Sequence, residues 1–167
     1  MSTISFEFFS ADAQEAVFGL SRIHAEKLQL PNIGTDVLWL GLMTPTQSNR
    51  ADTPITRLLK NSFDLSRLDV YEAVEAVSAR ALQRTESGYT KEAANVLNDT
   101  VTQARKIGRV NHREPVVTRI LVFENLIKAG DVTFRQVIAN LTQKNNAFNL
   151  KRLDHELKYN IRSLTTR

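Results

Sequence analysis

The residues that could carry catalysis are few in this sequence. Its three histidines are His24, His112 and His155, and it contains no cysteine. His24 has no histidine or carboxylate four residues away, and the acidic neighbours of His155 in "DHE" point to other sides of a helix. Ser21 lies near His24 in "GLSRIH", but a serine nucleophile needs a sharp exposed turn, whereas Ser21 is expected in mid-helix. The sequence therefore predicts no catalytic centre and no metal site, and the histidines are expected at surface or capping positions.

A polar helix start is the most informative feature of residues 29–43, "QLPNIGTDVLWLGLM". Gly34 permits a turn that other residues resist, and Thr35 can cap the free N–H groups of the helix that follows. Asp36 in the first turn is favoured by the helix dipole. A well-capped helix is by itself a sufficient explanation of these three residues. Trp39, further along the same helix, is expected in the core; the alternative is an exposed tryptophan that contacts a partner.

The composition of the chain is that of an ordinary soluble globular protein, with 42% hydrophobic and 24% charged residues among 167. That length is enough for one domain or for two small halves that share a core. There is no apolar stretch of about 18 residues, so no transmembrane helix is expected. The initial "MSTISFEFFS" lacks the pattern of a secretory signal. The absence of cysteine excludes disulfides and is compatible with the cytoplasmic location that we expect.

Charge is distributed unevenly along the chain, whose net charge is +4. Residues 1–102 hold 9 Lys/Arg and 13 Asp/Glu (net −4), and residues 103–167 hold 13 and 5 (net +8). A basic half can bind nucleic acid or an acidic protein surface, although a solvated face is the simpler explanation. A helical nucleic-acid-binding protein is therefore the alternative function. Few aromatic residues other than Tyr159 accompany the C-terminal charges, which argues against it. Those charges are Lys151, Arg152, Lys158, Arg162 and Arg167.

Apolar spacing of helical period dominates the sequence, which has only four prolines and six glycines. The pattern predicts an all-α fold. Ser10 or Asp12 is expected as the N-cap of the first helix, and Thr90 as the N-cap of the fifth. The predicted helices of the first half span 11–28, about 36–43, a segment that begins at Pro54 in "PITRLLKN", and about 65–82.

The second half of the sequence repeats the plan of the first. A shift of 79 residues pairs Ala25 with Ala104, Leu28 with Ile107 and Leu42 with Leu121, and a shift of 85 pairs "LSRLD" (65–69) with "LKRLD" (150–154). Each unit is too small to bury a core well alone, so the two are expected to pack together. We therefore predict one domain over 8–163, made of two four-helix repeats with pseudo-two-fold symmetry. The repeats are placed at 8–83 and 88–163, with a hinge at 84–88.

The order and duplication of these segments resemble the double N-terminal repeat of the Clp-type protein-unfolding ATPases, over about residues 8–160. "AEKLQLPNIGTDVLWLGL" (25–42) is similar to the family's middle element, A-x-x-L-G-H-x-x-I-G-T-E-H-L-L-L-G-L, with Asp36 where the family usually has glutamate. "YTKEAANVL" (89–97) is similar to the opening element, and "LLKNSFDLSRL" and "VIANLTQKNNAFNLKRL" resemble the closing one. The chain has no G-x-x-x-x-G-K-[ST] loop, so neither ATP binding of the Walker type nor any other cofactor is expected.

The resemblance implies a non-catalytic protein-binding module of the Clp protease system. Such a module docks adaptor or substrate proteins, or joins a Clp protease or ATPase complex as an accessory subunit. In some bacterial members, the acidic residue at this position grips the guanidinium of phosphorylated arginine while nearby helix starts hold the phosphate. That chemistry suits a carboxylate beside free amides. The residues to which the resemblance assigns partner binding are Asp36, Thr35, Ser10, Thr90 and Glu114.

Two departures from the family pattern concern the same site. In the second repeat "NHREPVV" stands where the first repeat has its polar helix start. The position equivalent to Asp36 then falls on Pro115, and the nearest carboxylate, that of Glu114, lies one residue before it. In the first repeat the opening element fits only with a slip of one residue, since Phe9 matches but the downstream count points to Ser10. The position that corresponds to Thr90 is therefore Ser10 or Ala11. We therefore expect at most one phosphoarginine pocket, of weak affinity. We also predict that the helix start at Asp36 faces the helix that begins near Thr90.

Overall fold

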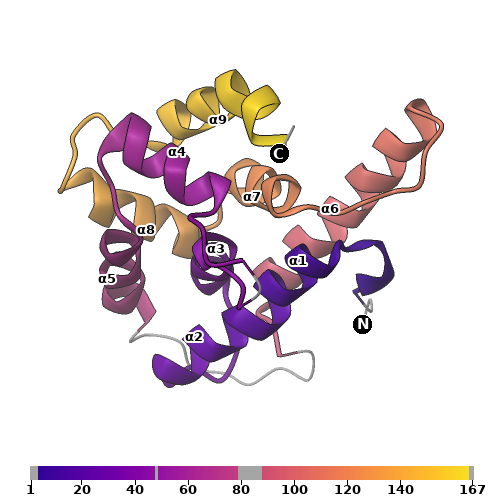
Figure 1. The fold of residues 1–167 in the computed structure, drawn as a ribbon. Coiled ribbons are helices and arrows are strands. Elements are labelled where there is room, and N and C mark those ends of the chain that lie inside the picture. The colour runs from indigo at the N-terminus through magenta and orange to yellow at the C-terminus, as the bar shows by residue number, and fades with distance from the viewer. Residues whose placement is uncertain (1–3, 48, 79–87, 166–167) are drawn as a thin grey trace.

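Helices form the regular structure of this protein (Figure 1). The computed structural model describes residues 4–47, 49–78 and 88–165, and within these ranges there are eight main helices and no strand, as predicted. The first of the eight is a continuous run of α1, the π-helical η2 and α2. The bounds are η1 (Phe6–Phe8, a 3-10 turn), α1 (Ala11–Gln14), η2 (Glu15–Leu20), α2 (Ser21–Lys27), α3 (Thr35–Met43), α4 (Pro54–Phe63), α5 (Arg67–Ser78), α6 (Lys91–Val110), α7 (Arg119–Ala129), α8 (Val132–Thr142) and α9 (Leu150–Thr165).

The π-helical turn η2 explains the one-residue slip in the first repeat. The hydroxyl of Ser21 donates a hydrogen bond of 2.7 Å to the carbonyl of Ala16, five residues earlier. In the matching helix α6, Thr100 donates a bond of the same length to Val96, only four residues earlier. A single π turn takes up one additional residue within an otherwise α-helical run. The slip is therefore an insertion that η2 absorbs, so that the buried faces of the two helices still correspond.

Two backbone bridges relate the halves to each other. Phe9 pairs with Val117, and Ile33 pairs with Tyr89, both in parallel orientation. Each bridge joins the residues before the first helix of one half to the residues before the second helix of the other half. The halves thus exchange equivalent contacts, which confirms the predicted pseudo-two-fold arrangement of two four-helix repeats.

The same bridges correct the register of the repeat. They make Val117 the equivalent of Ile33, which is a shift of 84 residues rather than 79. Leu42 therefore corresponds to Leu126, and its predicted pairing with Leu121 is wrong. The reason is that α2 ends at Lys27, whereas α6 continues for another turn and ends at Val110.

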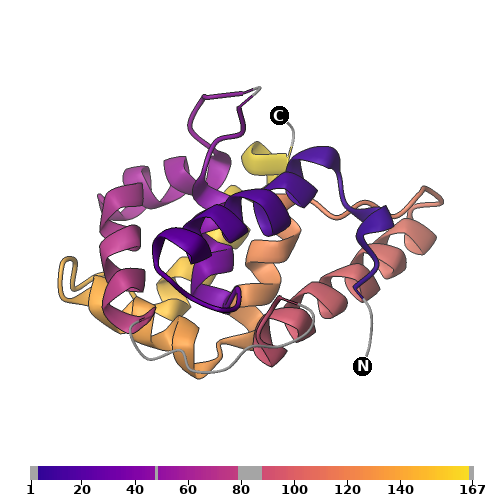
Figure 2. The same cartoon turned by 90° about the horizontal axis from the view of Figure 1, so that it is seen from below.

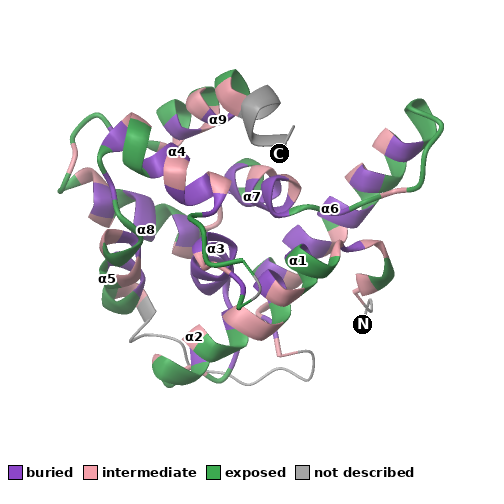
Figure 3. Ribbon diagram, viewed as in Figure 1, coloured by how far each residue is buried: buried purple, intermediate pink, exposed green. Residues whose placement is uncertain are grey.

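The core is organised around α3, whose residues are all buried (Figure 3). In Figure 2 the first helix, in indigo, crosses in front of α3. The Trp39 ring centroid lies 5.0 Å from that of Phe134 in α8 and 5.8 Å from that of Phe123 in α7. Trp39 is 0% exposed, so its predicted place in the core is confirmed.

Three predicted helix starts agree with the observed caps, and of the two candidates for the first cap, Ser10 and Asp12, it is Ser10 that caps the helix. Ser10 accepts from the backbone N–H of Ala13 at 3.1 Å, and Thr90 accepts from that of Ala93 at 3.2 Å. Pro54 occupies the first turn of α4 after the N-cap Thr53. The division into repeats at 8–83 and 88–163 stays a prediction, because the proposed hinge lies, apart from Gly88, outside the described residues.

Candidate functional site

The start of α3 lies beside the start of α6. Ile33 donates its N–H to the carbonyl of Gly88 at 2.8 Å, and Thr90 donates its N–H to the carbonyl of Ile33 at 2.9 Å. A Cβ atom at Gly34 would lie 3.7 Å from Cγ2 of Thr90 and only 2.7 Å from Oδ1 of Asp36. Glycine at position 34 therefore leaves room for the carboxylate of Asp36 to fold back over the turn. We call this contact between residues 33–36 and residues 88–90 the first junction. It brings the predicted binding residues Thr35 and Asp36 next to Thr90.

Thr35 does not cap its own helix, contrary to our expectation. The N-cap of α3 is Gly34, which makes no side-chain capping bond. Thr35 is the first helical residue, 1% exposed, and its hydroxyl instead donates to Oδ1 of Asp131 at 2.8 Å. Asp131 is the N-cap of α8. The hydroxyl thus ties α3 to the second half, because Thr35 already has helical geometry and faces the interior.

Asp36 is 4% exposed, so its carboxylate lies inside the junction and not on an open surface. At the corrected shift of 84, its equivalent in the second half is Ile120, a buried residue of α7. The expectation that the second carboxylate position falls on Pro115 was therefore wrong. Pro115 belongs to the loop after α6 instead of a helix start, since α6 is longer than its counterpart.

A second junction lies at the start of α1. Ser10 donates its N–H to the carbonyl of Val117 at 3.0 Å, and Val117 donates its own to Phe8 at 2.7 Å. Glu114 is exposed and borders a shallow cavity of about 1000 Å³ together with Phe8 and Arg105. The guanidinium of Arg105 lies 4.6 Å from the centroid of the Phe8 ring. This cavity is at the end of α6 that extends away from the other helices in Figures 1 and 2.

The two junctions are separated by the length of α6. Thr90 caps the N-terminal end of this 20-residue helix, and Glu114 follows its C-terminal end. At 1.5 Å per residue the helix is roughly 30 Å long. The structure therefore brings Asp36, Thr35 and Thr90 to one place and Ser10 and Glu114 to another.

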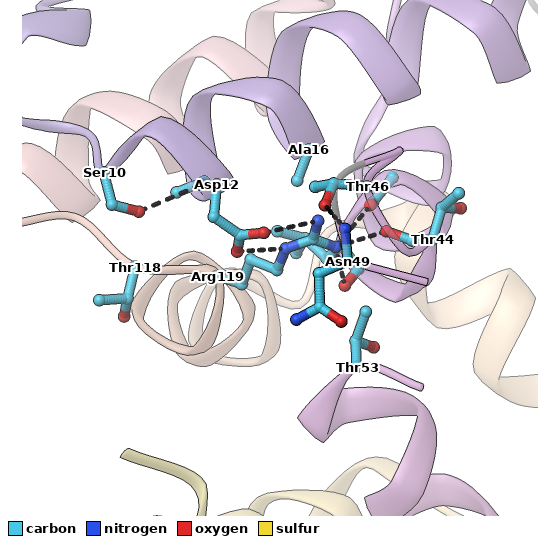
Figure 4. Close-up of polar contacts among 12 residues, drawn as sticks. Ser10, Asp12, Ala16, Thr44, Thr46, Asn49, Thr53, Thr118 and Arg119 are labelled. Carbon is cyan, nitrogen blue, oxygen red and sulfur yellow. Dashed lines mark hydrogen bonds and ion pairs between the residues drawn. The ribbon is translucent and has the colours of Figure 1, made fainter. Parts of the chain in front are cut away.

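Arg119 is a residue of the second junction that our sequence analysis missed. Its guanidinium is paired with the carboxylate of Asp12, through Nε at 2.7 Å and Nη2 at 3.2 Å (Figure 4). Nη1 also donates to the carbonyls that end α3, those of Gly41 at 3.2 Å, Leu42 at 2.9 Å and Thr44 at 2.7 Å. The side chain is 6% exposed. The available signal was an arginine directly before the apolar run that opens this helix, in "TRILVF".

The histidines form no metal or catalytic cluster in the described structure. His112 and His155 are exposed, as expected. His24 is half-buried, and burial, assisted by the charges of Lys27 and Arg67, lowers its pKa to about 4. Its expected surface or capping position was wrong, because the helix turns this side of α2 toward α3 and α5. No group of three or more potential ligands that could hold a metal ion occurs among the described residues.

The basic face near the C-terminus is only partly described. Lys151 and Arg152 are exposed on α9, and Lys158 pairs with Asp154 at 3.0 Å. Tyr159 is 80% exposed. The side chain of Arg162 and all of Arg167 lie outside the described structure. No helix within the described ranges is long and apolar enough to span a bilayer.

Comparisons with known proteins identify the fold. No protein-family model matches the chain, and no curated protein sequence matches it. The structure is similar to the crystal structure of the N-terminal domain of the caseinolytic protease associated chaperone ClpD from Arabidopsis thaliana, with a TM-score of 0.61 and 17% sequence identity. The match covers 94% of this chain and 99% of the Arabidopsis domain. The chain therefore has the fold of a Clp N-terminal domain, as the sequence resemblance predicted.

Proposed function

We propose that this chain is a non-catalytic, cytoplasmic protein-binding module of the Clp protease system. It docks adaptor or substrate proteins, or it joins a Clp protease or ATPase complex as an accessory subunit. Its fold supports this proposal, since it matches almost the full length of the N-terminal domain of a protein described as a protease-associated chaperone. No contact in the described structure favours nucleic acid over protein as the partner.

The observation that carries the proposal is that the start of a helix in one half lies beside the start of a helix in the other half, at two places. Ile33 and Tyr89 form one junction, and Phe9 and Val117 form the other. Each junction places the N-terminal ends of two helices next to each other. Helix N-termini carry partial positive charge and donor groups, which favour anionic groups of a partner.

We assign partner binding at the first junction to Asp36, Thr35 and Thr90. Partner binding at the second junction is assigned to Ser10 and Glu114. A phosphorylated arginine is the finer candidate ligand for the first junction. Because Asp36 is 4% exposed, the guanidinium would have to displace the groups that cover the carboxylate. Such displacement costs free energy, so the expected affinity is weak.

The proposal is tested by capture of partners with the tagged chain, followed by mass spectrometry of covalently cross-linked complexes. Clp ATPase, protease or adaptor subunits should be enriched, with cross-links that map to one of the junctions. Ser10→Glu and Thr90→Glu, which place a carboxylate at each helix start, should reduce the enrichment. Lys151→Glu on α9 is the control and should not. Retention of nucleic acid in place of Clp proteins, reversed by the Lys151 variant, would support the alternative function.

A further inference from the structure

A cavity in the first half is lined by none of the residues that form the two backbone bridges. It lies among α2, α3, α4 and α5, opens to the surface and has a volume of about 560 Å³. Leu40 forms part of its apolar wall. The polar side chains that line it include His24, Lys27, Thr44, Lys60, Arg67 and Tyr71.

One hydrogen-bond acceptor beside this cavity is left unused. The hydroxyl of Thr44 donates its proton to the carbonyl of Leu40 at 2.7 Å. His24 Nε2, which is 2.8 Å from Thr44 Oγ1, must therefore be the donor in that contact. The ring is neutral at neutral pH, so Nδ1 carries a free lone pair. Nδ1 is buried and has no hydrogen-bond partner among the described residues, whereas buried polar atoms are nearly always paired.

The second half contains an internal comparison for this position. At the shift of 79 that relates α2 to α6, His24 corresponds to Gln103. Asn125 donates to Oε1 of Gln103 at 2.7 Å and to the carbonyl of Leu121 at 2.9 Å. The amide oxygen of Gln103 is thus satisfied within the protein. The acceptor on His24 has no such partner among the described residues, and because Nδ1 is buried, a donor from outside reaches it only when the groups that cover it move aside.

Three cationic side chains line the same cavity as His24. Lys27, Lys60 and Arg67 line the cavity, and none of them forms an ion pair with another residue in the described part of the chain. Lys27 and Arg67 lie close enough to His24 to depress its pKa. Asp52 opposes these charges from the α4 side of the cavity. The site therefore suits a ligand that combines negative charge with an N–H or O–H donor.

We propose that this cavity binds an acidic peptide segment of a partner protein. Carboxylates of the peptide pair with Lys27, Lys60 and Arg67, and a backbone N–H of the same peptide displaces the groups that cover Nδ1 of His24 and donates to it. Leu68, which is 64% exposed, lines the cavity beside Tyr71 and offers an apolar surface to a neighbouring peptide side chain.

A peptide fits these features better than a nucleic acid does. Every acidic residue of a peptide carries a carboxylate and a backbone N–H a few bonds apart, whereas the sugar–phosphate backbone of DNA has no donor of its own and that of RNA has only the 2′-hydroxyl. Single-stranded nucleic acid is usually held by a row of stacking aromatic rings, and this lining contains Tyr71 and His24 alone among described aromatic residues. The inference rests on the first-half cavity and does not require either junction to bind a ligand.

The test uses the full chain and a fluorescently labelled peptide, AEELEEA, in anisotropy titrations at low salt. The peptide should bind, and its amide analogue AQQLQQA should bind at least about tenfold more weakly. Lys27→Glu and Lys60→Glu should each weaken binding of AEELEEA by about tenfold. Lys106→Glu is the matched control, because Lys106 occupies the position of Lys27 in the second half, and it should leave the affinity unchanged. Thermal melting of each variant establishes that it is folded.

A nuclear magnetic resonance measurement on the unmodified chain complements the variants. The 15N signal of His24 Nδ1 should shift toward the value of a hydrogen-bonded acceptor when AEELEEA is added, while the exposed His155 should not respond. The proposal is overturned by the absence of peptide binding, or by equal losses in the Lys27 and Lys106 variants. It is also overturned if inorganic phosphate alone produces the full His24 shift, or if an oligouridylate binds more tightly than the peptide and is lost in the same variants.

Discussion

Thr35 and Arg119 occupy equivalent positions, and each side chain reaches across to the segment that follows the other's helix. Thr35 begins α3 and donates to Asp131, just after the end of α7. Arg119 begins α7 and donates to the carbonyl of Thr44, just after the end of α3. The first residue of α3 and the first residue of α7 are thus each hydrogen-bonded to the segment that follows the other helix, although the two side chains differ. The smaller contact uses a hydroxyl, and the larger uses a guanidinium.

Replacement of Arg119 should destabilise the fold. Arg119→Ala leaves three carbonyl groups at the end of α3 without their buried donor and removes the pair with Asp12, for a loss of about 2–4 kcal/mol in the free energy of unfolding. Asp12→Ala should cost only about 1 kcal/mol, because that carboxylate is 58% exposed. Urea denaturation measures both, with Arg152→Ala as a surface control near zero. Similar losses for the Arg119 and Arg152 variants would contradict this role.

Gly41 should tolerate no side chain. A Cβ atom there would overlap the hydroxyl of Ser21 and the carbonyl oxygen of Ala16, where α3 packs closely on the first helix. Gly41→Ala should therefore lower the free energy of unfolding by about 1–3 kcal/mol through overpacking. Gly19→Ala is the matched control in a helix, since the nearest atom to its Cβ would be 3.9 Å away. That variant should be neutral or stabilising by up to about 1 kcal/mol, and the reverse order of the two would refute the close packing.

Stability should depend on the titration of His24. Burial lowers the pKa of His24 from 6.5 to about 4, so between these pH values the unfolded chain binds a proton that the folded chain does not. Stability from this group is complete above about pH 6.5 and is lost as the pH falls toward 4. The melting temperature of the wild type should therefore decline more steeply over this window than that of His24→Gln. His155→Gln, at an exposed position, should follow the wild type; parallel curves for all three would rule out the effect.

Calorimetry with free phosphoarginine tests the finer site proposal at the first junction. A weak signal is expected for the wild type, and Asp36→Asn should abolish it, because the amide lacks the charge that pairs with guanidinium. Glu114→Gln should retain the signal, since Glu114 lies at the other end of α6. A wild type that gives no heat with phosphoarginine would restrict Asp36 to a structural role in the buried turn.

The local features of this fold could be predicted well from the sequence. Helix periodicity and capping residues act over one or two turns, so Thr90 was identified at its observed place and the first cap was narrowed to Ser10 or Asp12. The duplication could also be recognised, because the buried faces of α2 and α6 keep the same spacing. The prediction that the helix start at Asp36 faces the helix start at Thr90 followed from the symmetry.

Features that depend on contacts between distant segments could not be predicted in the same way. The hydroxyl of Thr35 had a plausible local role as a cap, and only the packing of α8 shows that it is directed to Asp131. Arg119 resembles any surface arginine until the end of α3 is placed against it. The burial of Asp36 likewise results from the junction between the halves, which periodicity does not describe.

The paired bridges have a consequence for how such a fold can arise. Each half has two short backbone segments that pair with the other half, one before its first helix and one before its second. In both bridges, the segment before the first helix of one half pairs with the segment before the second helix of the other. Two identical copies of one half could make both contacts with a single self-complementary surface, which is the geometry of a symmetric homodimer. The present chain is equivalent to such a dimer whose subunits are joined end to end. Once they are joined, each copy is free to change independently, as the insertion in η2 and the difference between Thr35 and Arg119 illustrate.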